Sequence, residues 1–191
     1  MAVEGSGQDR YHLAQVNIAV LRAPLDAPAT AGFVAALEPV NRLADSSPGF
    51  VWRLQTPEGD ATSVRAFDDD RILVNLSVWE SVEALWAFTY QSRHLDALRR
   101  RREWFHRLGD AYLALWWVAA GHVPTVEEAK VRLELLRRHG PGPDAFTLRE
   151  PFPAPGQRPA PTPPHAAKVA DPSPSGAGST GVPGRGTLRL H

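Results

Sequence analysis

Two segments of the chain, residues 11–20 and 71–80, place apolar side chains at every second position. Such alternation puts even-numbered residues on one face of a β-strand and odd-numbered residues on the other. From 14 to 20 and from 72 to 78 the even-numbered face is wholly apolar. The odd-numbered face of the two segments includes four polar side chains: Gln15, Asn17, Asn75 and Ser77. This mixture predicts two half-buried strands whose polar residues face an enclosed cavity and not water.

Hydrophobic period and turn residues predict the order strand, helix, strand, strand, helix, strand and a final helix. Strands are expected at 11–23, 50–56, 71–80 and 111–121. The three helices are expected to follow the capping residues Asp26, Ser81 and Thr125, the last one ending at Gly140. This order is that of an α+β, ferredoxin-like βαββαβ fold with an added C-terminal helix.

In a ferredoxin-like fold the helices cover one face of a four-stranded antiparallel sheet. The apolar even-numbered positions, such as Ile72 and Val74, are expected to lie under the helices, and the odd-numbered face to border the cavity. The face that the helices leave bare has to be covered, and small chains often cover it with a second copy. A homodimer is therefore expected.

The composition divides the chain into three parts. Residues 1–10 are expected to be a disordered N-terminus, and 11–150 the folded domain. From 151 to 191 the chain is rich in Pro and Gly and almost free of large apolar residues, so it is expected to be a disordered tail. A docking peptide for an SH3-like module is the alternative for this tail.

Charge and cysteine content exclude several classes of function. Lys plus Arg and Asp plus Glu both number 21, which argues against general nucleic-acid binding. The chain has no Cys, so disulfides, thiolate nucleophiles and zinc–thiolate sites are excluded. No signal-peptide pattern and no apolar run long enough for a bilayer are found, and a cytoplasmic protein without membrane contact is expected. No metal site is predicted, because no motif has the spacing of metal ligands.

Six separated motifs resemble those of the family called domain of unknown function 3291. They are "HLAQVNIAVLRAPLDAP", "SPGFVWRLQ", "LVNLSVWESVEAL", "HLDALRRRREWF", "LWWVAAGHVPTVEEA" and "GPGPDAF". The family looks like a member of the dimeric α+β barrel superfamily, which includes antibiotic-biosynthesis monooxygenases, haem-degrading enzymes, isomerases, aldoxime dehydratases and stress-response ligand binders. The resemblance implies a fold, a dimer and a small-molecule pocket, but no particular reaction.

Two residues are candidates for chemistry. His94 is predicted to act as a general acid or base, and the resemblance supports this because active relatives often place a pocket histidine on the second helix. Asn75 is predicted to hold a carbonyl or oxyanion, with Ser77 beside it. The alternatives are a surface histidine, and amides that only bond Gln15 and Asn17 across the strands.

Further residues are candidates for binding a substrate. Arg53 projects toward the cavity or an interface, the alternative being a structural salt bridge. Trp79 and one of Trp116 and Trp117, with Trp117 preferred, are candidates for an aromatic wall, the alternative being plain core. His122 lies at a strand end, where it serves either the site or a turn. The predicted substrate-binding set is Gln15, Asn17, Arg53, Ser77, Trp79, Trp117 and His122.

Three functions are compatible with these residues. The first is a small-molecule enzyme, either a cofactor-independent monooxygenase or an isomerase or dehydratase, acting on aromatic or polyketide-like metabolites. The second is a non-catalytic ligand-binding or stress protein that uses the same cavity. The third is a haem enzyme with His94 as the axial ligand. No cofactor is predicted for the first two.

Overall fold

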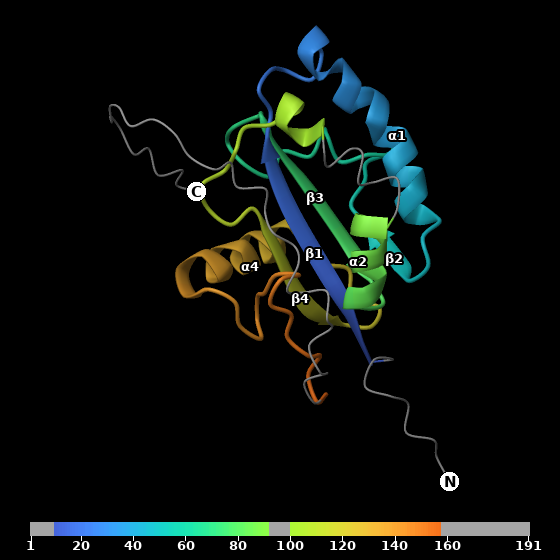
Figure 1. Ribbon diagram of the computed structural model, residues 1–191, viewed down its shortest axis with the longest axis vertical. Helices are drawn as coiled ribbons and strands as arrows, with labels where there is room; N and C mark the ends of the chain where they lie inside the picture. The colour runs from blue at the N-terminus through green and yellow to red at the C-terminus, as the bar shows by residue number, and fades with distance from the viewer. Residues whose placement is uncertain (1–9, 92–99, 158–191) are drawn as a thin grey trace.

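The computed structural model describes residues 10–91 and 100–157 (Figure 1). Its sheet has four antiparallel strands in the order β2-β3-β1-β4. The strands are β1 (Tyr11–Val20), β2 (Phe50–Arg53), β3 (Ile72–Trp79) and β4 (Leu113–Ala119). This is the predicted ferredoxin-like α+β arrangement, with all four strands shorter than expected.

The helices are α1 (Ala31–Asp45), α2 (Val82–Gln91) and α4 (Val126–His139), and residues 100–104 are also helical. Two predicted caps are confirmed, because the Ser81 hydroxyl accepts from the Ala84 N–H and the Thr125 hydroxyl from the Glu128 N–H. Asp26 does not cap α1. A short 3-10 turn, Pro28–Thr30, precedes this helix, and the buried Thr30 hydroxyl lies within hydrogen-bonding distance of three carbonyls of the loop. Within the described residues, no helix is long and apolar enough to span a membrane.

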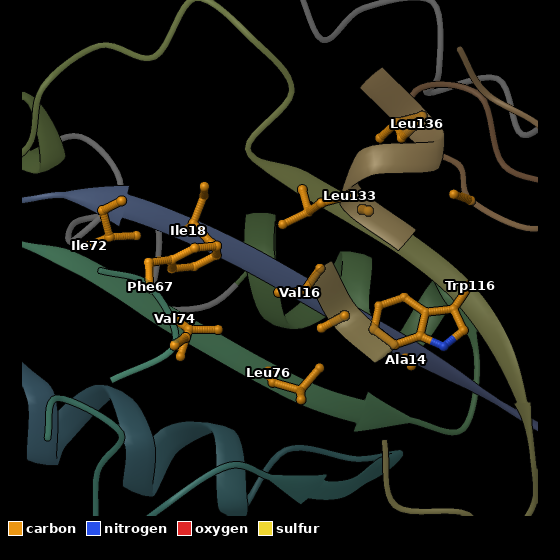
Figure 2. Close-up of a cluster of buried hydrophobic side chains, with 14 of the residues drawn as sticks. Ala14, Val16, Ile18, Phe67, Ile72, Val74, Leu76, Trp116, Leu133 and Leu136 are labelled. Carbon is orange, nitrogen blue, oxygen red and sulfur yellow. The ribbon is translucent and has the colours of Figure 1, made fainter. Parts of the chain in front are cut away.

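The two faces of the sheet are covered by different helices, and the predicted assignment of helices to faces is wrong. The even-numbered face packs against α4, whose Ala129, Leu133 and Leu136 join its core (Figure 2). The odd-numbered face lies under α1 and α2, whose Ala44 and Leu85 belong to a second core cluster. That cluster also includes three odd-numbered strand residues: Leu13, Trp79 and Leu115. The odd-numbered face, which was expected to need a second copy, thus lies under α1 and α2, and the added C-terminal helix covers the even-numbered face.

The described chain continues to residue 157, past the domain limit expected at 150. Phe146 exchanges two backbone hydrogen bonds with Leu115 of β4, which occupies part of this strand's outer edge. Phe152 packs against the second core cluster, and Ala154 is buried. Residues 151–157 therefore belong to the packed domain.

Two glycines with positive φ make a matched test of the contact between β2 and α2. A Cβ at Gly49 (φ 76°) would lie 2.6 Å from the Ala84 Cβ, whereas a Cβ at Gly59 (φ 90°) would meet nothing within 4 Å. Gly49→Ala and Gly59→Ala share a left-handed strain of about 1–2 kcal/mol. We expect Gly49→Ala to cost about 1–3 kcal/mol more, because of overpacking. Urea unfolding measures both, and equal losses would contradict the close approach.

Candidate functional site

A cavity of about 350 Å³ lies between the odd-numbered face of the sheet and helices α1 and α2. Its floor consists of residues from three adjacent strands, namely Gln15, Asn17, Ala19, Leu73, Asn75 and Leu113. Its roof comes from α1, α2 and the helical residues 100–104, and one side from the loop after β2. Gln15, Asn17 and Asn75 thus border this cavity, whereas Ser77 does not. The prediction of an enclosed cavity without water does not hold at Asn75, which is exposed.

Six aromatic side chains lie in the roof and at one end of this cavity. They are Phe33, Phe88, Tyr90, Trp104, Phe105 and Tyr112. Phe33 packs on Trp104 and Phe105 with ring centroids 5.9 Å and 5.0 Å apart, so this group is held by its own packing. A mainly apolar, aromatic lining with a few polar groups is typical of small-molecule sites. The volume, about 350 Å³, is within the range of small-molecule pockets.

Two polar residues of the floor, Gln15 and Asn17, belong to a chain of hydrogen bonds that also includes Trp79 and Ser77. Trp79 Nε1 donates to Ser77 Oγ over 3.0 Å, and Ser77 Oγ donates to Gln15 Oε1 over 2.8 Å. Gln15 Nε2 in turn donates to Asn17 Oδ1 over 2.8 Å. Gln15 and Ser77 are each 6% exposed. The cross-strand pairing between Ser77 and Gln15 was foreseen as the structural alternative for these residues, and it is present.

Asn75 differs from the other polar floor residues. It lies opposite Asn17 in the β1–β3 register and borders the cavity. Its side chain forms no hydrogen bond with any of the described residues, and it is the exposed member of a strand that is otherwise buried. Its amide is therefore available to a ligand.

Arg53 borders the cavity, but its hydrogen-bonding groups are used within the chain. Its Nε and Nη2 donate to the two carboxylate oxygens of Asp45 over 2.7 Å and 3.1 Å, and its Nη1 donates to the Gly59 carbonyl over 2.8 Å. The side chain is 11% exposed. The structural salt bridge is the observed arrangement, and its acid comes from α1 of the same chain.

The predicted tryptophans do not form the aromatic wall of the main cavity. Trp79 is buried, and it borders only an adjoining space of about 40 Å³ that also touches Ser77 and Arg53. Trp116 packs under α4. Trp117 lies on the cavity face of the sheet but beyond the cavity, where its Nε1 donates to the Phe152 carbonyl over 2.8 Å. Packing accounts for all three.

His122 is remote from the cavity and belongs to the turn after β4. Its Nε2 lies 2.8 Å from Glu128 Oε2, while Trp116 Nε1 donates to Glu128 Oε1 over 2.8 Å. Burial raises the pKa of Glu128, but the hydrogen bonds from His122 and Trp116, with the charges of His122 and Arg132, lower it to below its ordinary value. His122 thus helps to hold α4 to the sheet.

This lowered pKa predicts the direction of a pH effect. A carboxyl group whose pKa is lower in the folded protein adds stability above its unfolded pKa and loses it as the pH falls through the folded pKa. We expect Glu128→Gln to cost about 1–2 kcal/mol at neutral pH and to flatten the loss of stability below the ordinary pKa of 4.5. Urea unfolding across this pH range checks it, with exposed Glu127→Gln as the control. Parallel curves for Glu128→Gln and the unsubstituted protein would contradict it.

His94, the predicted acid or base, lies outside the described residues. The described lining of the cavity includes no histidine. Among residues 10–91 and 100–157, no three His, Cys, Asp or Glu side chains are grouped closely enough to hold a metal ion.

Sequence reasoning missed several cavity residues, of which Tyr90, Arg101 and Trp104 are the most informative. Arg101 borders the cavity, with its guanidinium carbon 4.6 Å from the Tyr112 ring centroid. It forms no ion pair with any described residue. Burial and the neighbouring Tyr112 raise the pKa of Tyr90, against the opposing charge of Arg149. Tyr90 is therefore a neutral phenol at physiological pH.

A family model described as "Domain of unknown function (DUF3291)" matches residues 12–162. No curated protein matches the chain.

Several solved structures are similar to parts of the chain. SnoaB, a cofactor-independent oxygenase from Streptomyces nogalater, is 20% identical with a TM-score of 0.36, covering 59% of this chain and 95% of that one. Rv0793 from Mycobacterium tuberculosis is 16% identical with a TM-score of 0.38, covering 60% and 99%. The NE2512 protein of unknown function from Nitrosomonas europaea is 13% identical with a TM-score of 0.38, covering 61% and 98%. TM-scores this low support no conclusion about activity.

Proposed function

The chain belongs to the DUF3291 family, and from that premise we propose that it is an enzyme that binds a planar aromatic or polyketide-like molecule in the cavity under α1 and α2. The proposed chemistry starts with loss of a proton from a carbon next to a substrate carbonyl. The negative charge then develops on the carbonyl oxygen, where the polar floor of the cavity stabilises it. No cofactor is required for this step.

The observation that carries the proposal is the position of Asn75. Asparagine is disfavoured in strands, and this one stands in the middle of β3 with buried neighbours on both sides. Its amide bonds no described residue and borders an aromatic-lined cavity. An uncommitted amide beside an apolar binding surface can turn its NH2 group toward a ligand oxygen and stabilise negative charge on it by a hydrogen bond.

Two other groups of the cavity support an oxygen-bearing substrate. The raised pKa of Tyr90 keeps its hydroxyl protonated, so it can donate a hydrogen bond. Arg101 supplies positive charge that no described carboxylate neutralises. Both favour a substrate that becomes negative during the reaction over one that stays neutral.

Two outcomes of the same carbanion are compatible with the cavity. Return of the proton to another carbon gives an isomer. Reaction with dioxygen converts the methylene to a carbonyl, one oxygen atom entering the product and the other leaving as water with the two methylene hydrogens. His94 is the proposed base, and a mutational test has to establish this.

The experiment uses anthrone, a planar ketone with an acidic methylene. We expect the full chain to accelerate exchange of the methylene protons with deuterium under anaerobic conditions, and Asn75→Ala to slow it about 100-fold. Gln55→Ala, which removes an exposed amide after β2, is the matched control. Oxygen uptake in air then separates an oxygenase from an isomerase.

His94→Gln is tested in the same assay. We expect loss of exchange by about 100-fold or more, with the exposed His139→Gln unchanged. Unchanged exchange in His94→Gln would reject His94 as the base. Anthrone binding without exchange or oxygen uptake would favour the non-catalytic ligand-binding protein, and absence of binding would contradict the proposed substrate class.

A further inference from the structure

We propose that Asn17 selects ligands that present a hydrogen-bond acceptor, because a buried chain of side chains fixes its amide with the NH2 group toward the cavity. The ligand group is a carbonyl or anionic oxygen on a planar ring system. This inference rests on the proposed function for its binding site. It adds Asn17 as a specificity-determining residue and states that the Asn17 amide donates a hydrogen bond to the ligand.

The direction of the chain originates at Trp79. The indole N–H is only a donor, so the Ser77 oxygen, 3.0 Å away, has to accept from it. The Gln15 side-chain oxygen, 2.8 Å from the same Ser77 oxygen, can only accept, so the single hydroxyl hydrogen of Ser77 is directed to it. The donor-only indole and the acceptor-only amide oxygen together settle the orientation of the hydroxyl.

The same logic passes through the two amides. Because the Gln15 oxygen accepts from Ser77, its nitrogen faces Asn17, and the Asn17 oxygen is the acceptor at 2.8 Å. The NH2 group of Asn17 takes no part in this chain of hydrogen bonds. It forms no hydrogen bond with a described residue, and it is not among the buried polar atoms that lack a partner in the described part of the chain. It is therefore reached from the cavity that Asn17 borders.

Burial keeps this chain of hydrogen bonds from reversing its donor-to-acceptor direction. Trp79 is 1% exposed, and Ser77 and Gln15 are 6% exposed, so water does not readily replace a broken link. Turning Gln15 around would leave the Ser77 hydroxyl hydrogen without its acceptor and would place the Gln15 oxygen against the Asn17 oxygen. Both mismatches leave buried groups unsatisfied, which is costly where the local dielectric is low. Asn75, opposite Asn17, has no such restraint and can turn to suit a ligand.

Three tricyclic molecules of the same shape test the direction. Fluorenone has an acceptor oxygen at its bridging position, carbazole has a donor N–H there, and fluorene has neither. We expect tryptophan-fluorescence titration of the full chain to give a fluorenone affinity about tenfold above that of fluorene, and a carbazole affinity no higher than that of fluorene. Equal affinities for all three would overturn the inference while leaving the binding site intact. No binding of any would instead contradict the proposed function.

Two sets of variants locate the cause of this selectivity. Asn17→Asp replaces the NH2 group with an oxygen, and we expect fluorenone to lose about tenfold in affinity while fluorene is unchanged. Ser77→Ala breaks the hydrogen-bond chain at a residue that does not line the main cavity, and the fluorenone-to-carbazole ratio is expected to fall toward one. Ser77→Thr, which keeps the hydroxyl, is expected to retain the ratio.

Thermal unfolding of each variant accompanies the titrations. If Ser77→Ala does not fold, Asn17→Asp still decides the point, because Asn17 is only half-buried. A Ser77→Ala protein that folds and keeps the full selectivity would reject Ser77 as a positioning residue. An Asn17→Asp protein that still prefers fluorenone would reject the donor role of Asn17.

Discussion

Leu133→Ala is expected to lower the free energy of unfolding by about 2–5 kcal/mol. Leu133 is fully buried at the centre of α4, where it packs on the even-numbered residues of the sheet together with Leu136 and Ala129 (Figure 2). Truncation removes apolar contacts with the sheet and leaves a cavity beneath the helix. The loss of stability is expected to be large because α4 is the helix that covers the even-numbered face in the part of the chain that the structure describes.

Val131→Ala is the matched control on the same helix. Val131 is 57% exposed, so its truncation is expected to change stability by no more than about 0.5 kcal/mol. Urea unfolding of the two variants measures the difference. A Leu133→Ala cost as small as that of Val131→Ala would mean that α4 does not cover the sheet in solution. Sedimentation of the same samples would then show whether a second copy covers it.

The strands and helix ends could be predicted because their causes are local. Alternation at 11–20 and 71–80 is a property of consecutive residues, and it revealed both strands with the correct faces. Ser81 and Thr125 bond the backbone three residues further on, so they mark helix starts in sequence as they do in space. These interactions join residues that are close together in the sequence, so the sequence alone predicts them.

The assignment of helices to the two faces could not be predicted in the same way. Both faces of the sheet are rich in apolar residues, and every helix has an apolar side. Period two shows that the faces differ but does not state which helix packs on which. The even-numbered face looked suited to α1 and α2 because it is more apolar, yet α4 supplies enough apolar surface to cover it.

The candidate site was predicted in its floor and missed in its roof. Gln15, Asn17 and Asn75 attracted attention as polar groups within strands, and all three border the cavity. Trp117 was placed on the correct face of the sheet but at the wrong position along β4. It pairs with Leu13, whereas the cavity residue Asn17 pairs with Leu113, four residues further along each strand. Strand register and helix packing decide which side chains line the cavity, and neither can be predicted from the pattern of neighbouring residues.

Trp79→Ala is expected to lower the free energy of unfolding by about 3–5 kcal/mol. The indole is 1% exposed and lies between two rings, with its centroid 5.0 Å from that of Phe88 and 5.3 Å from that of Phe50. Its removal enlarges the adjoining space of about 40 Å³ and leaves the Ser77 hydroxyl without its donor. Core packing and the polar floor of the cavity are thus lost together.

Trp79→Phe separates these two contributions. It keeps most of the apolar contact and removes the N–H, so we expect a stability loss of only about 1 kcal/mol, measured by urea unfolding. Trp117→Phe is the matched control, since it removes an indole N–H that donates to the Phe152 carbonyl beyond the cavity. Both variants should lose similar stability, but only Trp79→Phe should relax the preference for fluorenone over carbazole. If the two variants kept the same preference, the indole of Trp79 could not be what orients the floor amides, and its burial would serve packing alone.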